Sequence, residues 1–320
     1  MKSGTEKAEQ SSWKNHKNVT EFDFMGLWEN KQLELLFFLL FLLCYLAVLL
    51  GNSVILLTVT YSQLIEQTMY YFLCYLSLMD LCYTLTMVPR LIKYLAAATK
   101  NISRNECRTQ LFAAHLLAGV EIFILVCMAL DSYVAIIKPL HYLAIMNRKR
   151  CNMLIVMAWA VGFWYAIALL LMVLSLPFCG LNHISHYLCD IKPLLKLVCK
   201  DIHVVNILVI ANSEMVVAAI FLVLVASYMH IRYNLRTRSS VGQNKALSTC
   251  SSHVMVVVLF FVPLIYTYVL PAGSENKDKE ISVFYTVIAP MLNLLIYTLR
   301  NTEMKSTLRK LWSRMSHSEL

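Results

Sequence analysis

The stretch Met128–Tyr142 reads MALDSYVAIIKPLHY and closes an apolar segment of membrane-crossing length. Lys138-Pro139 ends it, because proline and the residue before it disfavour continuation of a helix. A carboxylate at the edge of such a helix, here Asp131, costs free energy unless it reaches water or a partner. Asp131 therefore marks either the boundary of the membrane or a switch, and composition alone favours the boundary.

The composition of the chain is that of a membrane protein. Its 320 residues are 59% hydrophobic and 15% charged, and the apolar residues come in runs of about twenty, the length that crosses a bilayer. We therefore expect one polytopic helical domain rather than two soluble ones. The formal net charge of +9 is interpreted as juxtamembrane charge that faces membrane lipids. Because no nucleic-acid-binding motif accompanies this charge, we expect no nucleic-acid partner.

Seven segments reach spanning length, which predicts an all-α, seven-transmembrane helix bundle. They are Leu35–Val59, Met69–Val88, Gln110–Leu130, Met153–Leu174, Val204–Met229, Ala246–Leu270 and Ile281–Leu299. Residues 1–34 form an N-terminal tail without a signal-peptide core, residues 35–299 the transmembrane domain and residues 300–320 a C-terminal tail. This last tail has apolar residues at helical spacing between basic ones, which predicts a short amphipathic helix on the membrane surface. The apolar residues are Met304, Leu308, Leu311 and Trp312.

The orientation of the chain follows from two N-glycosylation motifs. Basic residues occur in loops on both sides and do not decide it. The motifs Asn18-Val19-Thr20 and Asn101-Ile102-Ser103 fall on the same side of a seven-span chain, and only lumenal or extracellular loops are glycosylated. We therefore expect an extracellular N-terminus with glycans on Asn18 and Asn101, and a cytoplasmic C-terminal tail.

Four cysteines fall on this outer side, where an oxidising compartment favours disulfides. They are Cys107, Cys179, Cys189 and Cys199. Four cysteines allow three pairings, and the sequence by itself leaves these open. The remaining cysteines lie in or beside the spans and are interpreted as small core residues. Their spacing offers no metal site.

A few polar groups lie inside the predicted spans, where each is a candidate functional residue. They are Asn52, Asp80, Glu121 and Asn293. Together they are expected to form one buried cluster, in which a cation or protons neutralise the two carboxylates. Oxygen donors suit a hard cation such as sodium, and we expect no other cofactor. The alternative is a hydrogen-bonded network that only holds helices together.

A second group of residues suggests a ligand pocket. Four residues of the third segment, at spacing i, i+3, i+4 and i+7, share one helix face. They are joined by two polar residues of the fifth segment and by three residues of the sixth that follow Pro263, which is expected to bend it. A mostly apolar cavity with a few fixed polar groups suits a small organic ligand; ordinary interhelical contacts are the alternative. The candidates are His115, Ala118, Gly119, Ile122, Asn212, Ser213, Leu264, Ile265 and Tyr268. No catalytic arrangement is present, so we expect no enzyme.

Several motifs resemble those of one family. MALDSYVAIIKPLHY is similar to MAYDRYVAICKPLHY, the signature of odorant receptors in the rhodopsin-like G-protein-coupled superfamily. KALSTCSSH at Lys245–His253 is similar to the family's KALSTCxSH, PMLNLLIY to its PMLNPLIY, and LSLMD to its LSxxD. The resemblance runs from about Asn18 to Trp312. The chain departs from the family at Leu130, where the family has tyrosine, at Thr68 and Leu294, where it has proline, and at Ser132, where it has arginine.

The resemblance implies a plasma-membrane receptor that binds a small hydrophobic or volatile molecule. Such a receptor signals through a stimulatory heterotrimeric G protein and raises cAMP. The family's PFC…CD…C pattern implies the disulfides Cys107–Cys189 and Cys179–Cys199. Its odorant pocket and a sodium ion, present in the inactive state, are implied at the positions given above. The G-protein-coupling residues that it implies are Asp131, Ser132, Tyr133, Tyr228 and Tyr297.

Ser132 suggests an alternative function for the chain. The family's arginine pairs with the preceding Asp in the inactive state and supports the G protein in the active state, and serine has neither the charge nor the reach. We therefore expect Asp131 to lack a partner, and we hypothesise weak or absent coupling. A receptor-like protein that binds a ligand without activating a G protein is the alternative. A transporter or channel would show inverted repeats or broken helices, which the sequence lacks.

Overall fold

The computed structural model describes residues 21–24, 31–96, 101–176, 183–184, 186–198, 203–235, 240–269, 279, 281–299 and 301–318. Within these ranges the side chains of 31–33, 203–214, 235, 240–250, 267–269, 299, 302, 312 and 314–318 are not described.

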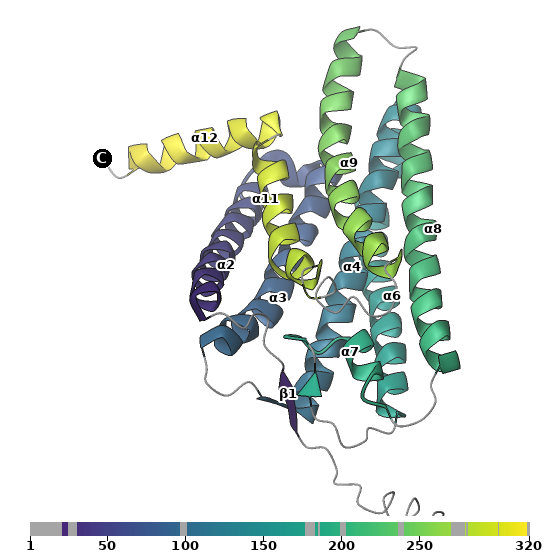
Figure 1. Ribbon diagram of the computed structural model, residues 1–320. Coiled ribbons are helices and arrows are strands. Elements are labelled where there is room, and N and C mark those ends of the chain that lie inside the picture. Colours follow the sequence, from purple (N-terminus) through teal and green to yellow (C-terminus); the bar gives the residue numbers. More distant parts are fainter. Residues whose placement is uncertain are drawn as a thin grey trace, which may run out of the picture.

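Long helices running side by side make up the body of the molecule (Figure 1). Six helical segments of the described chain are long and apolar enough to cross a membrane, and Ser251–Tyr266 adds a shorter apolar one. The last span joins a turn of π-helix, η3 (Phe284–Ile288), to α11. The prediction of an all-α, seven-helix bundle is confirmed. The long helices are α2 (Lys31–Thr60), α3 (Thr68–Ala96), α4 (Arg104–Ile137), α6 (Arg148–Leu174), α8 (His203–Leu235), α9 (Ser240–Val269) and α11 (Ala289–Leu299).

Helix α4 extends beyond the predicted membrane span at both ends. A capping box starts it: Ser103 Oγ accepts from the Glu106 backbone N–H at 3.3 Å, and the Glu106 carboxylate accepts from the Ser103 N–H at 3.2 Å. The helix then continues past the expected end of the membrane span at Leu130 and stops before Lys138-Pro139, where the sequence predicted its end. Asp131 is therefore inside a helix and only 3% exposed.

A small sheet covers one end of the bundle. Strand β1 (Glu21–Phe24) lies between β2 (Asn101–Ser103), with which it is antiparallel, and β3 (His183–Ile184), with which it is parallel. Exposed and buried residues alternate along β1, so that Phe22 and Phe24 point into an apolar core. The N-terminal tail thus contributes a strand that its polar composition did not predict.

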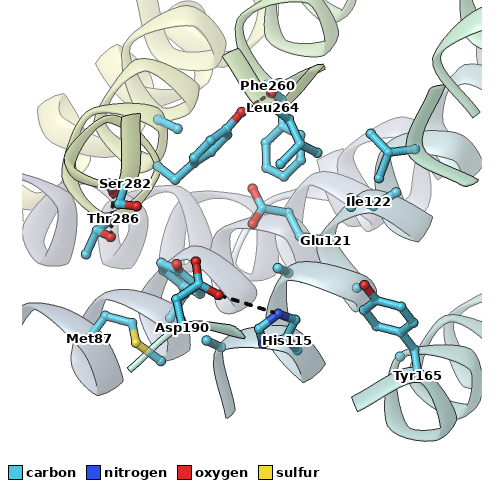
Figure 2. A pocket seen from close by; sticks show the side chains of 18 of the residues that line it. Met87, His115, Glu121, Ile122, Tyr165, Asp190, Phe260, Leu264, Ser282 and Thr286 are labelled. Carbon is cyan, nitrogen blue, oxygen red and sulfur yellow. Dashed lines mark hydrogen bonds and ion pairs between the residues drawn. The ribbon is translucent and has the colours of Figure 1, made fainter. Parts of the chain in front are cut away.

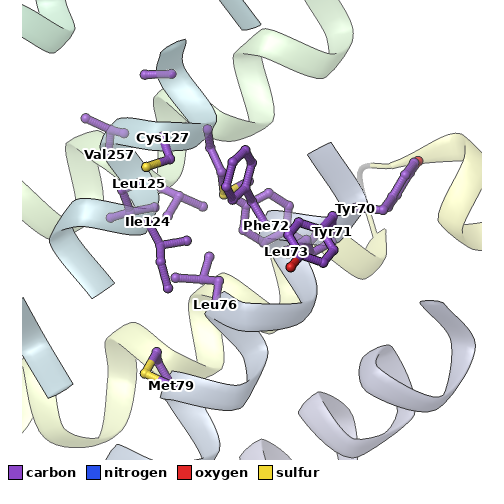
Figure 3. Packing of buried hydrophobic residues seen from close by; sticks show 14 of the residues in the cluster. Tyr70, Tyr71, Phe72, Leu73, Leu76, Met79, Ile124, Leu125, Cys127 and Val257 are labelled. Carbon is purple, nitrogen blue, oxygen red and sulfur yellow. The ribbon is translucent and has the colours of Figure 1, made fainter. Parts of the chain in front are cut away.

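Two large apolar cores hold the described chain together. The larger lies between the helices, and Figure 3 shows Phe72, Leu76 and Ile124 packed in it. The smaller lies beneath the sheet. Helices α4 and α6 approach each other closely at Gly162, where the absence of a side chain permits it. A β-carbon on Gly162 would lie 2.9 Å from Val120 Cγ2 and 3.1 Å from the Leu116 carbonyl oxygen. Small residues allow helices to pack in this way inside membranes.

Helix α12 (Thr302–Ser318) turns away from α11 at the end opposite the sheet (Figure 1). Its first turn is capped by Asn301 Oδ1, which accepts from the Glu303 and Met304 N–H groups at 3.1 and 3.2 Å. The Tyr70 hydroxyl donates to the same oxygen at 2.9 Å and so joins this cap to α3. Met304 is buried. Lys305, Arg309 and Lys310 are exposed, which is the amphipathic pattern that the sequence predicted.

The short remaining elements connect the helices. They are η1 (Gln63–Glu66), η2 (Pro139–His141), α5 (Tyr142–Ile145) and α7 (Ile191–Leu195).

Candidate functional site

A cavity of about 290 Å³ lies between the helices, near the end that carries the sheet. Its wall is formed by residues of α3, α4, α6, α8, α9, η3, α11 and the loop before α7 (Figure 2). Apolar side chains such as Met87, Phe260 and Ile220 form much of it. A concave, mostly apolar space with a few polar groups is suited to a small organic molecule.

Five of the predicted pocket residues line this cavity: His115, Ala118, Gly119, Ile122 and Leu264. The first four come from one face of α4, as their spacing predicted.

The other pocket candidates are placed differently. Ile265 does not line the cavity but packs against the main apolar core, because consecutive helical residues point about 100° apart. The side chains of Asn212, Ser213 and Tyr268 lie outside the described residues.

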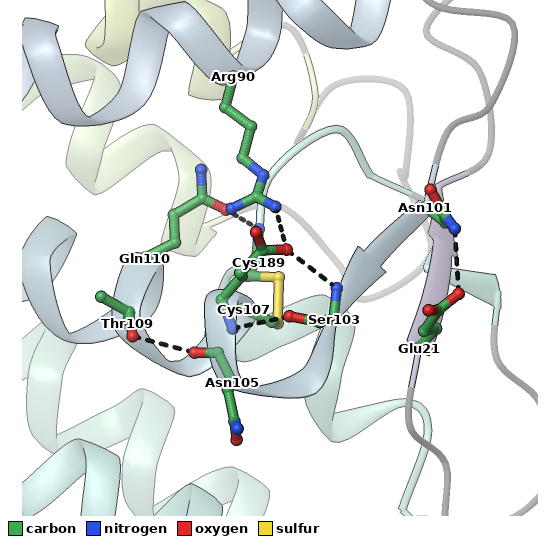
Figure 4. A network of polar contacts seen from close by, with 10 residues as sticks. Glu21, Arg90, Asn101, Ser103, Asn105, Cys107, Thr109, Gln110 and Cys189 are labelled. Atoms are coloured by element: carbon green, nitrogen blue, oxygen red, sulfur yellow. Dashed lines mark hydrogen bonds and ion pairs between the residues drawn. A yellow bond between two sulfur atoms is a disulfide. The ribbon is translucent and has the colours of Figure 1, made fainter.

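A disulfide between Cys107 and Cys189 fixes the loop that borders the cavity. Cys107 is the fourth residue of α4, and the side-chain Oε1 of Gln110 accepts from the Cys189 backbone N–H at 3.2 Å. Next to it, Arg90 Nη2 contacts the Glu106 carboxylate at 2.7 Å (Figure 4). These contacts bring Asp190, the residue after Cys189, to the cavity wall. The cysteines of the second predicted disulfide, Cys179 and Cys199, lie outside the described residues.

The loop and the seventh span supply wall residues that sequence reasoning missed. Asp190 lies opposite His115, with its Oδ1 4.0 Å from His115 Nε2. His186 Nε2 lies 3.1 Å from Ser282 Oγ and so connects the loop to the seventh span. The pattern Cys189-Asp190 could have suggested Asp190, whereas no sequence signal pointed to His186. The further missed wall residues include Tyr165, Ser282, Tyr285 and Thr286.

Glu121 joins the cavity to a buried polar cluster. Its side chain both lines the cavity and lies 3.4 Å from Asn293 Nδ2, which also lies 3.5 Å from Asp80 Oδ1. All three side chains are at most 6% exposed. Three of the four predicted residues are therefore brought together. Asn52 is also buried, but its amide donates to the Val48 carbonyl oxygen within α2 at 3.1 Å.

The predicted coupling residues lie toward the other end of the bundle. The Tyr142 hydroxyl donates to Asp131 Oδ1 at 2.9 Å, so the expectation that Asp131 lacks a partner was wrong. Burial, and then the charge of Asp131, raise the pKa of Tyr142 and keep its phenol a donor at neutral pH. Ser132 is 9% exposed. Thr68 Oγ1 contacts the Met146 carbonyl oxygen at 3.5 Å and so connects the start of α3 to this region.

Three tyrosines complete the predicted coupling set. The Tyr228 hydroxyl hydrogen-bonds His253 Nδ1 and so joins α8 to α9. Tyr133 lies edge-to-face with His230, with ring centres 5.7 Å apart. Tyr297 is buried in the main core. Tyr133 and Tyr228 both pack against Ile136 and Ile231, and Tyr228 also packs against the core that contains Tyr297.

One of the two predicted glycosylation sites lies on the small sheet. Asn101 is exposed on β2, and its Nδ2 donates to Glu21 Oε2 at 3.0 Å. Asn18 lies outside the described residues.

Comparisons with known proteins agree on one family. A family model described as olfactory receptor matches residues 41–315. Olfactory receptor 4B13 of Mus musculus is 48% identical over 300 residues, which are 94% of this chain and 98% of that protein. Olfactory receptor 4S2 of Homo sapiens is 47% identical over 93% of this chain and 96% of its own length. Olfactory receptor 4A47 of Homo sapiens is 48% identical over the same shares. The chain therefore belongs to the olfactory receptor family, and it is a multi-pass plasma-membrane receptor with a small-molecule ligand and a G-protein partner rather than an enzyme.

Proposed function

We propose that this chain detects a small hydrophobic or volatile molecule that enters the cavity between its helices from outside the cell. The observation that carries this proposal is the 290 Å³ cavity whose wall contains His115, Ala118, Gly119, Ile122 and Leu264. The volume is at the small end of the range for ligand pockets, which favours a compact ligand. The Cys107–Cys189 disulfide supports the proposal because it fixes the loop that borders the cavity.

The N-terminus and the sheet lie outside the cell in this proposal. The motif at Asn101, which is exposed on β2, supports that orientation, as does the motif at Asn18, because only lumenal or extracellular segments are glycosylated. The disulfide between Cys107 and Cys189, close to the same sheet, suits an oxidising compartment. The exposed basic face of α12 then lies against the anionic inner leaflet.

The signal at the inner end is a rise in cAMP through a stimulatory G protein. A ligand that binds the active arrangement of the helices more tightly shifts the population toward it. The Tyr142–Asp131 hydrogen bond and the Tyr228–His253 hydrogen bond are the described contacts at this end that activation would rearrange.

A sodium ion is proposed at the polar cluster beneath the cavity. Asp80 and Glu121 are both buried and share the single amide of Asn293. Two carboxylates in hydrocarbon need a cation or protons to compensate their charge, and oxygen donors fit a hard cation. Asp80, Glu121 and Asn293 would hold the ion, which would supply that positive charge.

Ser132 supports a second candidate function, a receptor that binds its ligand but couples weakly. Ser132 is 9% exposed and uncharged. The Asp131–Tyr142 bond preserves an inactive-state contact without an arginine, whereas nothing at position 132 supplies the long cationic side chain that supports a G protein. The Asp131–Tyr142 bond thus supports a receptor that keeps a contact of the inactive state and lacks the contact with the G protein in the active state.

One experiment distinguishes the two candidates. Wild type and Ser132→Arg are expressed at matched surface level and tested against an odorant panel, with both cAMP and ligand-dependent thermal stabilisation recorded. Stabilisation together with a cAMP rise in the wild type supports full signalling. Stabilisation with a cAMP rise only in Ser132→Arg supports weak coupling. Stabilisation of neither protein by any panel member would contradict ligand binding.

Ala118→Trp tests whether the described cavity is the site. Tryptophan at Ala118 fills the cavity, so the variant should lose responses that the wild type gives. Leu222→Trp is the matched control, because Leu222 is 67% exposed on the outer surface of α8 and lies away from the cavity.

A further inference from the structure

The charged groups of the cavity wall define the chemistry of its ligand. Among the described residues that line the cavity there is no lysine or arginine, and the acidic groups are Glu121 and Asp190. The remaining titratable nitrogens belong to His115 and His186. Without a fixed positive charge, this wall has nothing to compensate an anionic ligand.

His115 presents an acceptor to the cavity. Its Nδ1 lies 2.9 Å from the Leu111 carbonyl oxygen, which can only accept, so Nδ1 carries the proton. In the neutral ring Nε2 is then the acceptor. This nitrogen lies 4.0 Å from Asp190 Oδ1, another acceptor, as the dashed line in Figure 2 indicates. Asp190 Oδ1 also accepts from the Ile191 N–H at 2.7 Å, which holds the carboxylate in this position.

Other polar groups of the wall are already engaged within the protein. His186 Nδ1 accepts from the Leu188 N–H at 3.1 Å, which leaves the proton of the neutral ring on Nε2, facing Ser282 Oγ. The Tyr285 hydroxyl donates to the Phe260 carbonyl oxygen at 3.1 Å, and the Thr286 hydroxyl donates to the Ser282 carbonyl oxygen at 2.8 Å. These three donors of the wall are thus used internally, while the neutral ring of His115 and the carboxylate of Asp190 offer two acceptors that face each other.

We propose that the ligand of this cavity is a small primary amine, whose ammonium group lies between His115 Nε2 and Asp190 Oδ1. An ammonium nitrogen placed about 2.8 Å from both atoms would form an angle of roughly 90° with them. Two of its hydrogens could therefore point to the two acceptors. The ammonium satisfies both acceptors and compensates the charge of Asp190, while its alkyl chain lies among the apolar wall residues. This inference rests on the proposed function, because it names the ligand class of the same cavity.

The same geometry disfavours the other common odorant classes. An aldehyde or ketone brings only an acceptor to a position where two acceptors already face each other. A carboxylate adds a negative charge beside Asp190. An alcohol brings one donor and leaves one acceptor without a hydrogen. Water carries two donors, so an amine can displace it without leaving either acceptor unpaired, which the other classes cannot do.

The test uses four six-carbon probes that share one alkyl chain: hexylamine, hexan-1-ol, hexanal and hexanoate. Binding is measured as thermal stabilisation of the purified full chain in lipid nanodiscs at neutral pH, so the readout does not depend on G-protein coupling. Hexylamine should stabilise the protein at a concentration at least about tenfold lower than hexan-1-ol does. Hexanoate should give no stabilisation.

Two variants test the residues. Asp190→Asn keeps a side-chain oxygen for the Ile191 N–H but removes the charge, and His115→Phe removes the acceptor. Each should weaken hexylamine binding about ten- to a hundredfold, as expected for a lost hydrogen bond to a charged group. Asp23→Asn is the matched control: Asp23 also faces a histidine, with its Oδ2 3.8 Å from His183 Nδ1, but lies on β1 outside the cavity. It should leave hexylamine binding unchanged.

Each outcome of these binding measurements either supports or overturns the amine proposal. Equal or tighter binding of hexanal or hexanoate than of hexylamine would overturn the proposal, as would unchanged hexylamine binding in Asp190→Asn and His115→Phe. If hexanal or hexan-1-ol binds best and Ala118→Trp abolishes that binding, the amine proposal fails while the proposed cavity stands. If none of the four probes binds, the amine proposal fails, and the odorant panel decides separately whether the cavity binds any ligand.

Discussion

Replacing Gly51 by alanine should destabilise the protein through Leu294. A β-carbon on Gly51 would overlap Leu294 Cδ2 and lie 2.6 Å from its Cδ1, so the leucine side chain cannot keep its position. Leu294 is only 8% exposed and packs in the main core. Such overpacking costs about 1–3 kcal/mol in soluble proteins. We expect Gly51→Ala to lower the free energy of unfolding by this amount.

A double-mutant cycle tests whether this contact is the cause. Leu294→Ala alone leaves a void and should cost about 2–5 kcal/mol. In the double variant the new methyl group at position 51 enters the vacated space. The total loss should therefore be smaller than the sum of the single losses by at least about 1 kcal/mol.

The assay is thermal unfolding of the four purified proteins in the same detergent. Leu295→Ala is the control partner, because Leu295 is the next residue but is 39% exposed. Its effect should add to that of Gly51→Ala. Additive losses for Leu294→Ala as well would refute the assignment of the Gly51 effect to Leu294.

Three further predictions concern other parts of the chain. Cys107→Ser should abolish surface expression, because the bridge to Cys189 closes a long loop and such bridges contribute about 2–4 kcal/mol in soluble proteins; normal trafficking and ligand response would argue against it. Tyr142→Phe removes the hydrogen bond to Asp131 and should cost about 1–3 kcal/mol, seen as a lower midpoint of thermal unfolding and a higher basal signal; unchanged values of both would show that this bond does not hold the inactive state. Ser132→Arg should increase agonist-driven cAMP at matched surface level, and a strong wild-type response that the substitution does not enhance would contradict this.

The sequence predicted the helices well because their signal is local. A run of apolar residues of spanning length identifies a membrane helix without reference to other parts of the chain. The membrane span was expected to end at Leu130, whereas the helix was expected to stop at Lys138-Pro139, and it does. The burial of Asp131 could not be predicted, because it depends on the Tyr142 hydroxyl as a partner. That partner lies eleven residues along the chain, beyond a proline, and no periodicity indicates it.

The sheet could not be predicted, because strand pairing depends on three segments that are far apart in sequence. Phe22 and Phe24 alternate with acidic residues, but such a short pattern carries little information on its own. It becomes a strand only beside β2 and β3.

The candidate site likewise contains residues that the sequence predicted and residues that it could not predict. Residues of one α4 face, such as His115 and Ala118, were predicted because helical spacing determines which side chains share a face. Asp190 and His186 come from an irregular loop, whose path is set by the disulfide to Cys107 rather than by a repeating pattern. Glu121 was predicted as part of the polar cluster, but its place in the cavity wall required the relative position of α4 and its neighbours.

The most direct test of the central claim is ligand-dependent thermal stabilisation of the full chain with its cavity open or filled. The wild type, Ala118→Trp and Leu222→Trp are compared across the same odorant panel and the hexylamine series. We predict that ligands stabilise the wild type and Leu222→Trp alike and do not stabilise Ala118→Trp. Equal stabilisation of all three proteins would show that the ligand binds outside the cavity and would contradict the account.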